Sequence, residues 1–127
     1  MAPFTRTPSE PFRIERPGNT PLRFDGWRIA HVDSRDLWSE HQRQARDRWA
    51  DVSIYRTDSG KWVYAQVGKT SDPNFRERAV VRVCNTPADV YKALTGRETY
   101  VTKTALAVLR QAIDNDPALA ELAEERI

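Results

Sequence analysis

The sequence predicts an α+β fold, in which a small antiparallel sheet of three to five strands packs against helices and follows a proline-rich N-terminal arm. The stretch SIYRTDSGKWVYAQV, residues 53–67, contains two alternating runs around a polar turn, which indicates a β-hairpin. Elsewhere apolar residues recur every three or four positions, the spacing of amphipathic helices. Five of the eight prolines lie in residues 1–21, where they disfavour helix and favour an extended or disordered arm.

A chain of 127 residues normally forms one domain, so we predict an arm over 1–21 and a single α+β domain over 22–127. Phe4, Phe12 and Ile14 are the apolar side chains with which the arm could dock. The only cysteine is Cys84, which excludes an intrachain disulfide and favours a reducing, cytoplasmic location. The N-terminus lacks the apolar core of a secretory signal, and no apolar run is long enough to span a membrane.

The charge is unevenly distributed along the chain. Residues 1–110 hold nineteen basic and thirteen acidic side chains, a net of +6, whereas residues 111–127 have a net of −4. A basic body could attract an anionic partner such as DNA or RNA, although a surplus of this size is also common in soluble proteins.

In the first half of the domain, the sequence predicts strands and a helix. Asp25-Gly26 between alternating residues predicts a short hairpin over 22–32, with a lone strand over 27–32 as the alternative. A helix is expected over 34–50, because one apolar stripe repeats every three or four residues. That stripe contains Leu37, Trp38, His41, Ala45 and Trp49.

In the second half of the domain, the sequence predicts a three-stranded meander and helices. Strands are expected over 52–67 and 78–84, with Gly60 in a left-handed position of the first turn. Thr86 followed by Pro87 predicts a helix that ends at Gly96. A second helix is expected from Thr102 or Thr104 onward, and a short final helix is expected after the cap residue Asp116.

The hairpin over 52–67 can be aligned so that its two faces differ in chemistry. If Arg56 pairs with Lys61, directly opposed residues place Val52, Ile54, Val63 and Val67 on one face. The helices are then expected to cover this aliphatic face. The other face would carry the aromatic side chains together with Arg82 of the next strand, and these rings are Tyr55, Trp62 and Tyr64.

Three interpretations of this aromatic face are open. In the first, the arm or the helix over 34–50 covers it as a second core layer, since aromatic residues in sheets usually pack. In the second, it is an exposed surface for a protein partner, because Tyr, Trp and Arg are enriched at interface hot spots. In the third, it stacks unpaired bases, with nearby Arg and Lys side chains on the phosphates.

Motifs for enzymatic chemistry are missing from the sequence. There is no phosphate-binding glycine loop, no HExxH and no paired CxxC, so we predict no enzyme, no cofactor and no metal site. Cys84 with His31 could form a nucleophile–base pair, but a strand cysteine beside valines is more typical of a small buried hydrophobe. His31 and His41 have no further metal ligands at a suitable spacing.

We therefore predict a non-enzymatic cytoplasmic binding protein that regulates or inhibits another macromolecule, either a protein or a protein–nucleic-acid complex. The predicted binding residues are Tyr55, Trp62, Tyr64, Arg82, Arg78, Lys61 and Arg56. The alternative is direct binding of DNA or RNA by the basic body. The order strand–helix–helix from residue 78 onward resembles that of ribbon-helix-helix DNA-binding homodimers. That resemblance implies a dimer strand pair with Arg78 and Arg82 outward, although the upstream hairpin offers the strand a partner within the chain.

Overall fold

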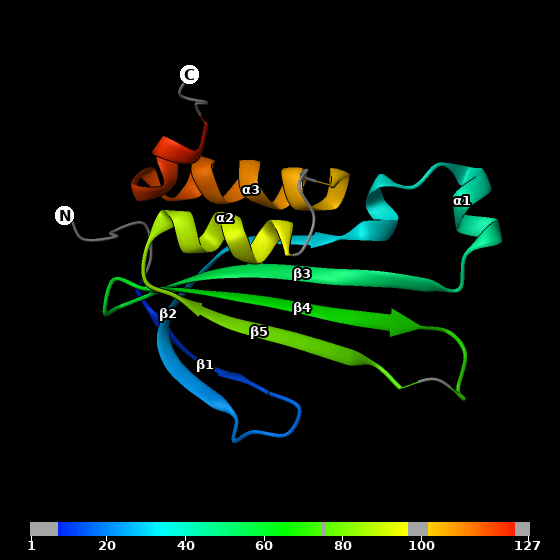
Figure 1. Cartoon of the computed structure of the whole chain (residues 1–127), viewed down its shortest axis with the longest axis horizontal. Helices are drawn as coiled ribbons and strands as arrows, with labels where there is room; N and C mark the ends of the chain where they lie inside the picture. Colours follow the sequence, from blue (N-terminus) through cyan, green and yellow to red (C-terminus); the bar gives the residue numbers. More distant parts are fainter. Residues whose placement is uncertain (1–7, 75, 97–101, 124–127) are drawn as a thin grey trace.

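The structure is a computed structural model that describes residues 8–74, 76–96 and 102–123. Five antiparallel strands form one sheet in the chain order β1-β2-β3-β4-β5 (Figure 1). The strands are β1 (Glu10–Ile14), β2 (Leu22–Asp33), β3 (Arg48–Thr57), β4 (Trp62–Thr70) and β5 (Arg78–Cys84). The helices are η1 (Ser34–Leu37), α1 (Glu40–Ala45), α2 (Pro87–Thr95), α3 (Lys103–Asn115) and η2 (Pro117–Ala123). The predicted α+β fold is confirmed.

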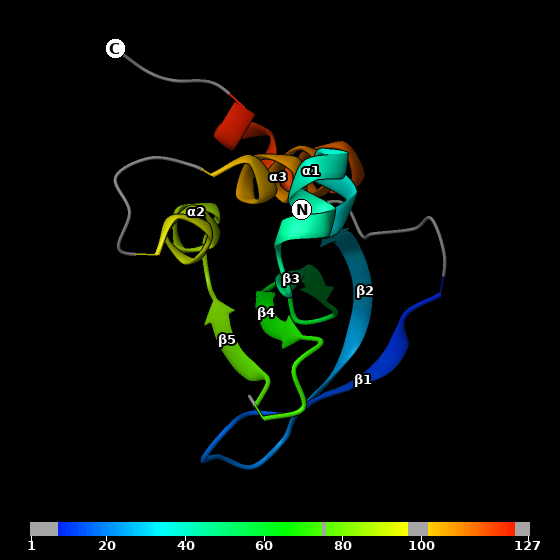
Figure 2. The same ribbon diagram turned by 90° about the vertical axis from the view of Figure 1, so that its right-hand side faces the viewer.

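The sheet is curled, and its two faces are covered differently. Helices α2 and α3 lie across one face, which we call the helix face (Figure 1). The β1–β2 hairpin bends beneath the opposite face, which we call the open face (Figure 2). There Phe12 and Ile14 of β1, with Leu22 and Phe24 of β2, pack against a small buried cluster that includes Tyr55. Part of the predicted arm thus forms an edge strand of the sheet; Phe4 lies outside the described residues.

The C-terminal half follows the local signals in its sequence. Strand β5 has the predicted bounds, and Thr86 caps α2 by accepting a hydrogen bond from the backbone N–H of Asp89. Thr102 caps α3 in the same way, and Gly96 ends α2 with a positive φ of 57°. After Asp116, the last segment adopts 3-10 geometry. The cap residue is therefore the predicted one, but the helix after it is wound more tightly than the expected α-helix.

The structure differs from prediction between residues 22 and 50. Strand β2 runs without a turn through Asp25 and Gly26, and it carries a bulge between Arg28 and Ala30. The predicted helix over 34–50 is wrong: it is replaced by η1 and the six-residue α1, and after residues 46–47 the chain enters β3. Trp49 lies in β3 opposite Lys69, so pairing with neighbouring strands outweighs the helical spacing.

The predicted register of the β3–β4 hairpin is also wrong. Thr57 donates its backbone N–H to the carbonyl of Lys61 at 2.8 Å, which leaves a three-residue loop over 58–60. Gly60 occupies the left-handed position at φ 85°, as is usual in such loops. Arg56 therefore pairs with Trp62, and Tyr55 pairs with Val63. A shift of one residue exchanges the faces of one strand relative to the other.

This register mixes aliphatic and aromatic side chains on both faces. Ile54, Trp62 and Tyr64 join the main core beneath α2 and α3. Tyr55 and Val63 belong to the smaller core that the β1–β2 hairpin covers. In the part of the chain that the structure describes, no helix combines the length and apolar character needed to cross a membrane.

Candidate nucleic-acid interface

The three aromatic residues predicted to form a binding surface are buried. Tyr55, Trp62 and Tyr64 have exposed fractions of 7%, 4% and 4%. Trp62 and Tyr64 point to the helix face, whereas Tyr55 contacts Phe12 and Phe24 with ring centroids 4.8 and 5.4 Å away. The predicted aromatic surface is therefore absent. For Tyr55 the arm supplies the cover, as the first of the three interpretations anticipated.

The four predicted basic binding residues lie in different places. Arg56 is buried, and Lys61 is exposed beside the β3–β4 turn. Arg78 and Arg82 are exposed on β5, on the side that faces the helices. The structure thus does not bring the predicted set together.

Arg56 belongs to a buried polar cluster. Its Nη1 lies 2.7 Å from Oδ2 of Asp116, which also accepts a hydrogen bond from Nε1 of Trp62 at 2.9 Å. The guanidinium sits 5.0 Å from the centre of the Trp62 ring. Asp116 is 1% exposed and accepts, through Oδ1, the backbone N–H of Ala118. These contacts tie β3 and β4 to the start of η2, which is a structural role.

Basic side chains gather instead at the other end of β3 and β4. A hollow of about 590 Å³ lies there, bordered by Arg48, Lys69, Arg76 and Arg78. A second hollow of about 460 Å³ shares Arg48 and adds Arg46. Among the described residues, neither hollow is lined by a carboxylate. We call these five residues, Arg46, Arg48, Lys69, Arg76 and Arg78, the basic end.

Two indole rings lie among these cations. Trp49 borders both hollows, and Trp38 borders the second. The guanidinium of Arg46 lies 5.6 Å from the centre of the Trp38 ring, and that of Arg35 lies 4.2 Å from the centre of the Trp49 ring. Nε1 of Trp49 is buried and has no hydrogen-bond partner among the described residues. The rings hold the guanidinium groups in place by cation–π contact.

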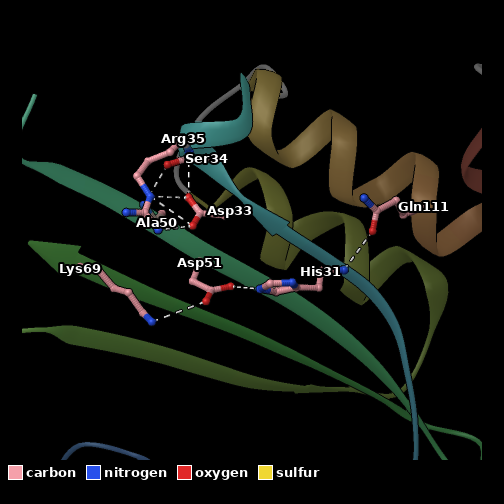
Figure 3. Close-up of polar contacts among 8 residues, drawn as sticks. All are labelled: His31, Asp33, Ser34, Arg35, Ala50, Asp51, Lys69 and Gln111. Atoms are coloured by element: carbon pink, nitrogen blue, oxygen red, sulfur yellow. Dashed lines mark hydrogen bonds and ion pairs between the residues drawn. The ribbon is translucent and has the colours of Figure 1, made fainter. Parts of the chain in front are cut away.

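A row of polar side chains crosses the open face beside the basic end (Figure 3). Asp51 of β3 lies between His31 of β2, whose Nε2 contacts Oδ1, and Lys69 of β4, whose Nζ is 3.7 Å from Oδ2. Asp33 binds Arg35, with Nη2 2.6 Å from Oδ2. Because the Arg35 side chain donates to it, the pKa of Asp33 is lowered. Each of these carboxylates already faces a cation, so Asp51 neutralises part of the charge of Lys69.

Sequence reasoning missed Arg46 and Arg48 because it placed residues 34–50 on one helix. In that helix Arg46 lies on the solvent-exposed face opposite the apolar stripe. The available signal was the density of arginine in RQARDRW, residues 43–49. Only the strand pairing of Arg48 with Thr70 shows that this segment approaches the β4–β5 connection.

Cys84 does not have the environment of a nucleophile. Its side chain is 2% exposed in the main core, and burial raises the pKa of its thiol to about 11. His31 lies on the open face, so the predicted Cys84–His31 pair is not brought together. Within the described residues, no group of three or more His, Cys, Asp or Glu side chains is arranged to hold a metal ion.

We expect Cys84 to react slowly with iodoacetamide in the folded protein. Only the thiolate attacks the reagent, and a pKa of about 11 instead of 9.0 lowers the thiolate fraction at pH 8 by about a hundredfold. The alkylation rate, followed by mass spectrometry, should therefore rise with pH up to about 11. Protein unfolded in guanidinium is the control and should react at an ordinary rate. Equal rates in the folded and unfolded protein would contradict this account of the buried thiol.

Comparison with protein families, curated proteins and solved structures finds no match to this chain.

Proposed function

We propose that the protein binds nucleic acid through the basic end, without catalysing a reaction on it. The observation that carries this proposal is the larger hollow, which Arg48, Lys69, Arg76 and Arg78 all border and whose lining includes no described carboxylate. Lys and Arg side chains that neutralise phosphates release counterions, and this release supplies most of the affinity of sequence-independent binding.

The chemistry around the hollow supports a phosphate-bearing ligand. Arg can contact two phosphate oxygens at once, and Thr70 and Asn74 add polar groups at the rim. Asp51 offsets part of the charge on Lys69, and Asp72 and Glu77 lie in the β4–β5 connection. The net attraction is thus moderate, and we expect dissociation constants of about 10⁻⁴–10⁻⁶ M at physiological salt.

The regulatory role that the sequence predicted depended on an exposed aromatic surface. Because Trp62 and Tyr64 lie in the main core, a protein partner would need another part of the molecule. Direct binding of DNA or RNA, the alternative from the sequence, has the better physical support.

We expect the double variant Arg76→Ala/Arg78→Ala to bind a fluorescein-labelled oligonucleotide about 10- to 100-fold more weakly than the parent protein at 50 mM salt. Each lost phosphate contact should also reduce the slope of log K against log [salt] by about 0.7–0.9. Fluorescence anisotropy with single-stranded and duplex DNA, titrated between about 50 and 200 mM salt, measures both quantities.

The matched control is Arg23→Ala/Arg110→Ala, which removes the same charge from two exposed positions on β2 and α3. It should bind almost as tightly as the parent protein and keep nearly the full salt slope. Equal losses in the two double variants would mean that only net charge matters, and the basic end would not be the interface. Binding that is absent in the parent protein at 50 mM salt would overturn the proposal as a whole.

A further inference from the structure

The two edge strands of the sheet are protected to different degrees. Strand β1 has five residues and includes Pro11, which cannot donate a backbone hydrogen bond. Strand β5 has seven residues with no proline or glycine. Among the described residues β5 pairs only with β4, and Figure 2 shows no strand beyond it. Its outer backbone groups therefore form an edge to which a further strand can hydrogen-bond.

The side chains of β5 divide into two rows. Arg78, Val80 and Arg82 point to the helix face, and Ala79, Val81 and Val83 point to the open face. Val80 is 44% exposed and Val83 is 49% exposed, which places two β-branched apolar side chains in solvent on opposite faces of one edge strand. A strand added at this edge would cover both of them.

A small apolar hollow lies next to Val83 on the open face. It measures about 300 Å³ and is bordered by Leu22, Phe24, Val63 and Val83, with the β3–β4 turn at its rim. Such a hollow can receive one apolar side chain from a segment that runs along β5.

We propose that the edge of β5 binds an extended acidic segment of a partner protein as a sixth, antiparallel strand. Directly opposed residues share a face, so the partner needs acidic residues opposite Arg78 and Arg82, four positions apart, with an apolar residue opposite Val80. The residue opposite Val83 enters the apolar hollow. From its N-terminus the segment therefore reads apolar, acidic, any residue, apolar, any residue, acidic.

The charges of β5 disfavour a second copy of this chain as the occupant. Antiparallel self-pairing centred on Val80 places Arg78 of each copy opposite Arg82 of the other, and like charges directly opposed are destabilising. Self-pairing centred on Val81 places Arg82 opposite Val80, which leaves the guanidinium without a cross-strand partner. An acidic strand satisfies both arginines at once.

This inference is independent of the nucleic-acid proposal if it is tested at Arg82. Arg78 borders the basic end as well as lying on β5, whereas Arg82 lines neither of the two basic hollows. The variant Arg82→Glu therefore separates the two surfaces. Its affinity for an oligonucleotide should stay close to that of the parent protein.

The test titrates a fluorescein-labelled synthetic peptide with the pattern above into the full chain and follows anisotropy. We expect the parent protein to bind this peptide about tenfold more tightly than a scrambled peptide of the same composition. Arg82→Glu should weaken binding about tenfold, and a peptide with lysine opposite position 82 should bind Arg82→Glu better than it binds the parent. Peptide binding should also slow hydrogen exchange of the amides of residues 78–84.

Several results would overturn the proposal. Equal affinity for the patterned and the scrambled peptide would mean that charge attraction alone accounts for binding. Binding without added protection of the amides in 78–84 would place the peptide elsewhere on the molecule. A dimer in sedimentation equilibrium that Arg82→Glu dissociates would identify a second copy as the occupant of the edge.

Discussion

Replacing Asp116 with alanine is expected to lower the free energy of unfolding by about 3–5 kcal/mol, the cost of removing one partner of a buried ion pair. The carboxylate accepts hydrogen bonds from Arg56 at 2.7 Å and from Trp62 at 2.9 Å, and it also caps the start of η2. In the variant the Arg56 guanidinium loses the carboxylate that faces it. Because Arg56 is only 4% exposed, water cannot hydrate the guanidinium well enough to compensate. Urea denaturation followed by tryptophan fluorescence measures the change.

Asp114→Ala is the matched control, because Asp114 is exposed near the end of α3 and its loss changes the net charge equally. We expect that variant to remain within about 0.5 kcal/mol of the parent protein. The double variant Arg56→Met/Asp116→Leu should recover much of the lost stability, since apolar replacements of a buried pair are often tolerated. If Asp116→Ala is as stable as Asp114→Ala, the cluster does not hold β3, β4 and η2 together.

The parts of the fold that could be predicted from the sequence are those with local determinants. Thr86 and Thr102 satisfy helix N–H groups within three residues, at 3.2 and 3.1 Å. Gly96 supplies a left-handed residue where α2 ends. Such signals act over a single turn of chain, so α2 and α3 lie at the positions that the sequence predicts.

Residues 34–50 show the limit of periodicity. Trp38 and Trp49 fit one helical stripe, yet only residues 40–45 form α1, whose capping box begins at Ser39. From Arg48 onward the chain hydrogen-bonds to β4, and from Asp51 it also pairs with β2. These partners come from residues 26–33 and 62–70, so no local pattern reveals that they outweigh the helical preference.

The candidate site depends on strand register as well as on long-range strand pairing. The three-residue loop that ends at Gly60 sets the register of the hairpin, and one residue of shift buries Trp62 and Tyr64. The sequence contains the glycine but does not specify the loop length. The basic end joins residues from β3, β4, β5 and the connections that precede β3 and β5, and it becomes visible only once the strands are paired.

Two arginines on β3 show how position decides the role of one residue type. Arg48 and Arg56 are eight residues apart on the same face of the strand. Arg56 lies beneath η2, where Asp116 and Trp62 bind it in the core. Arg48 lies at the opposite end of β3, where it borders both basic hollows. Position along the strand thus separates an arginine bound in the core from one that can contact a polyanion.

Replacing Gly26 with alanine should destabilise the protein by about 3 kcal/mol, the upper part of the range for overpacked interiors. A Cβ at this position would lie 2.0 Å from the carbonyl oxygen of Arg56 and 2.9 Å from Cα of Thr57. Both are backbone atoms of β3, so β2 and β3 would have to separate. Gly26 also pairs with Glu10 of β1, which confines it from both sides.

Gly68→Ala is the control, because Gly68 is also a strand glycine but its new Cβ would meet only the carbonyl oxygen of Arg78 at 3.6 Å, an ordinary contact. That variant should be neutral or up to about 1 kcal/mol more stable, since alanine restricts the unfolded chain. Urea denaturation of both variants distinguishes two roles for Gly26. A large loss of stability in Gly26→Ala alone means that glycine permits the close approach of β2 to β3. Similar stabilities of the two variants would mean that β2 and β3 can separate without cost. Close packing of the strands would then not explain the glycine at position 26.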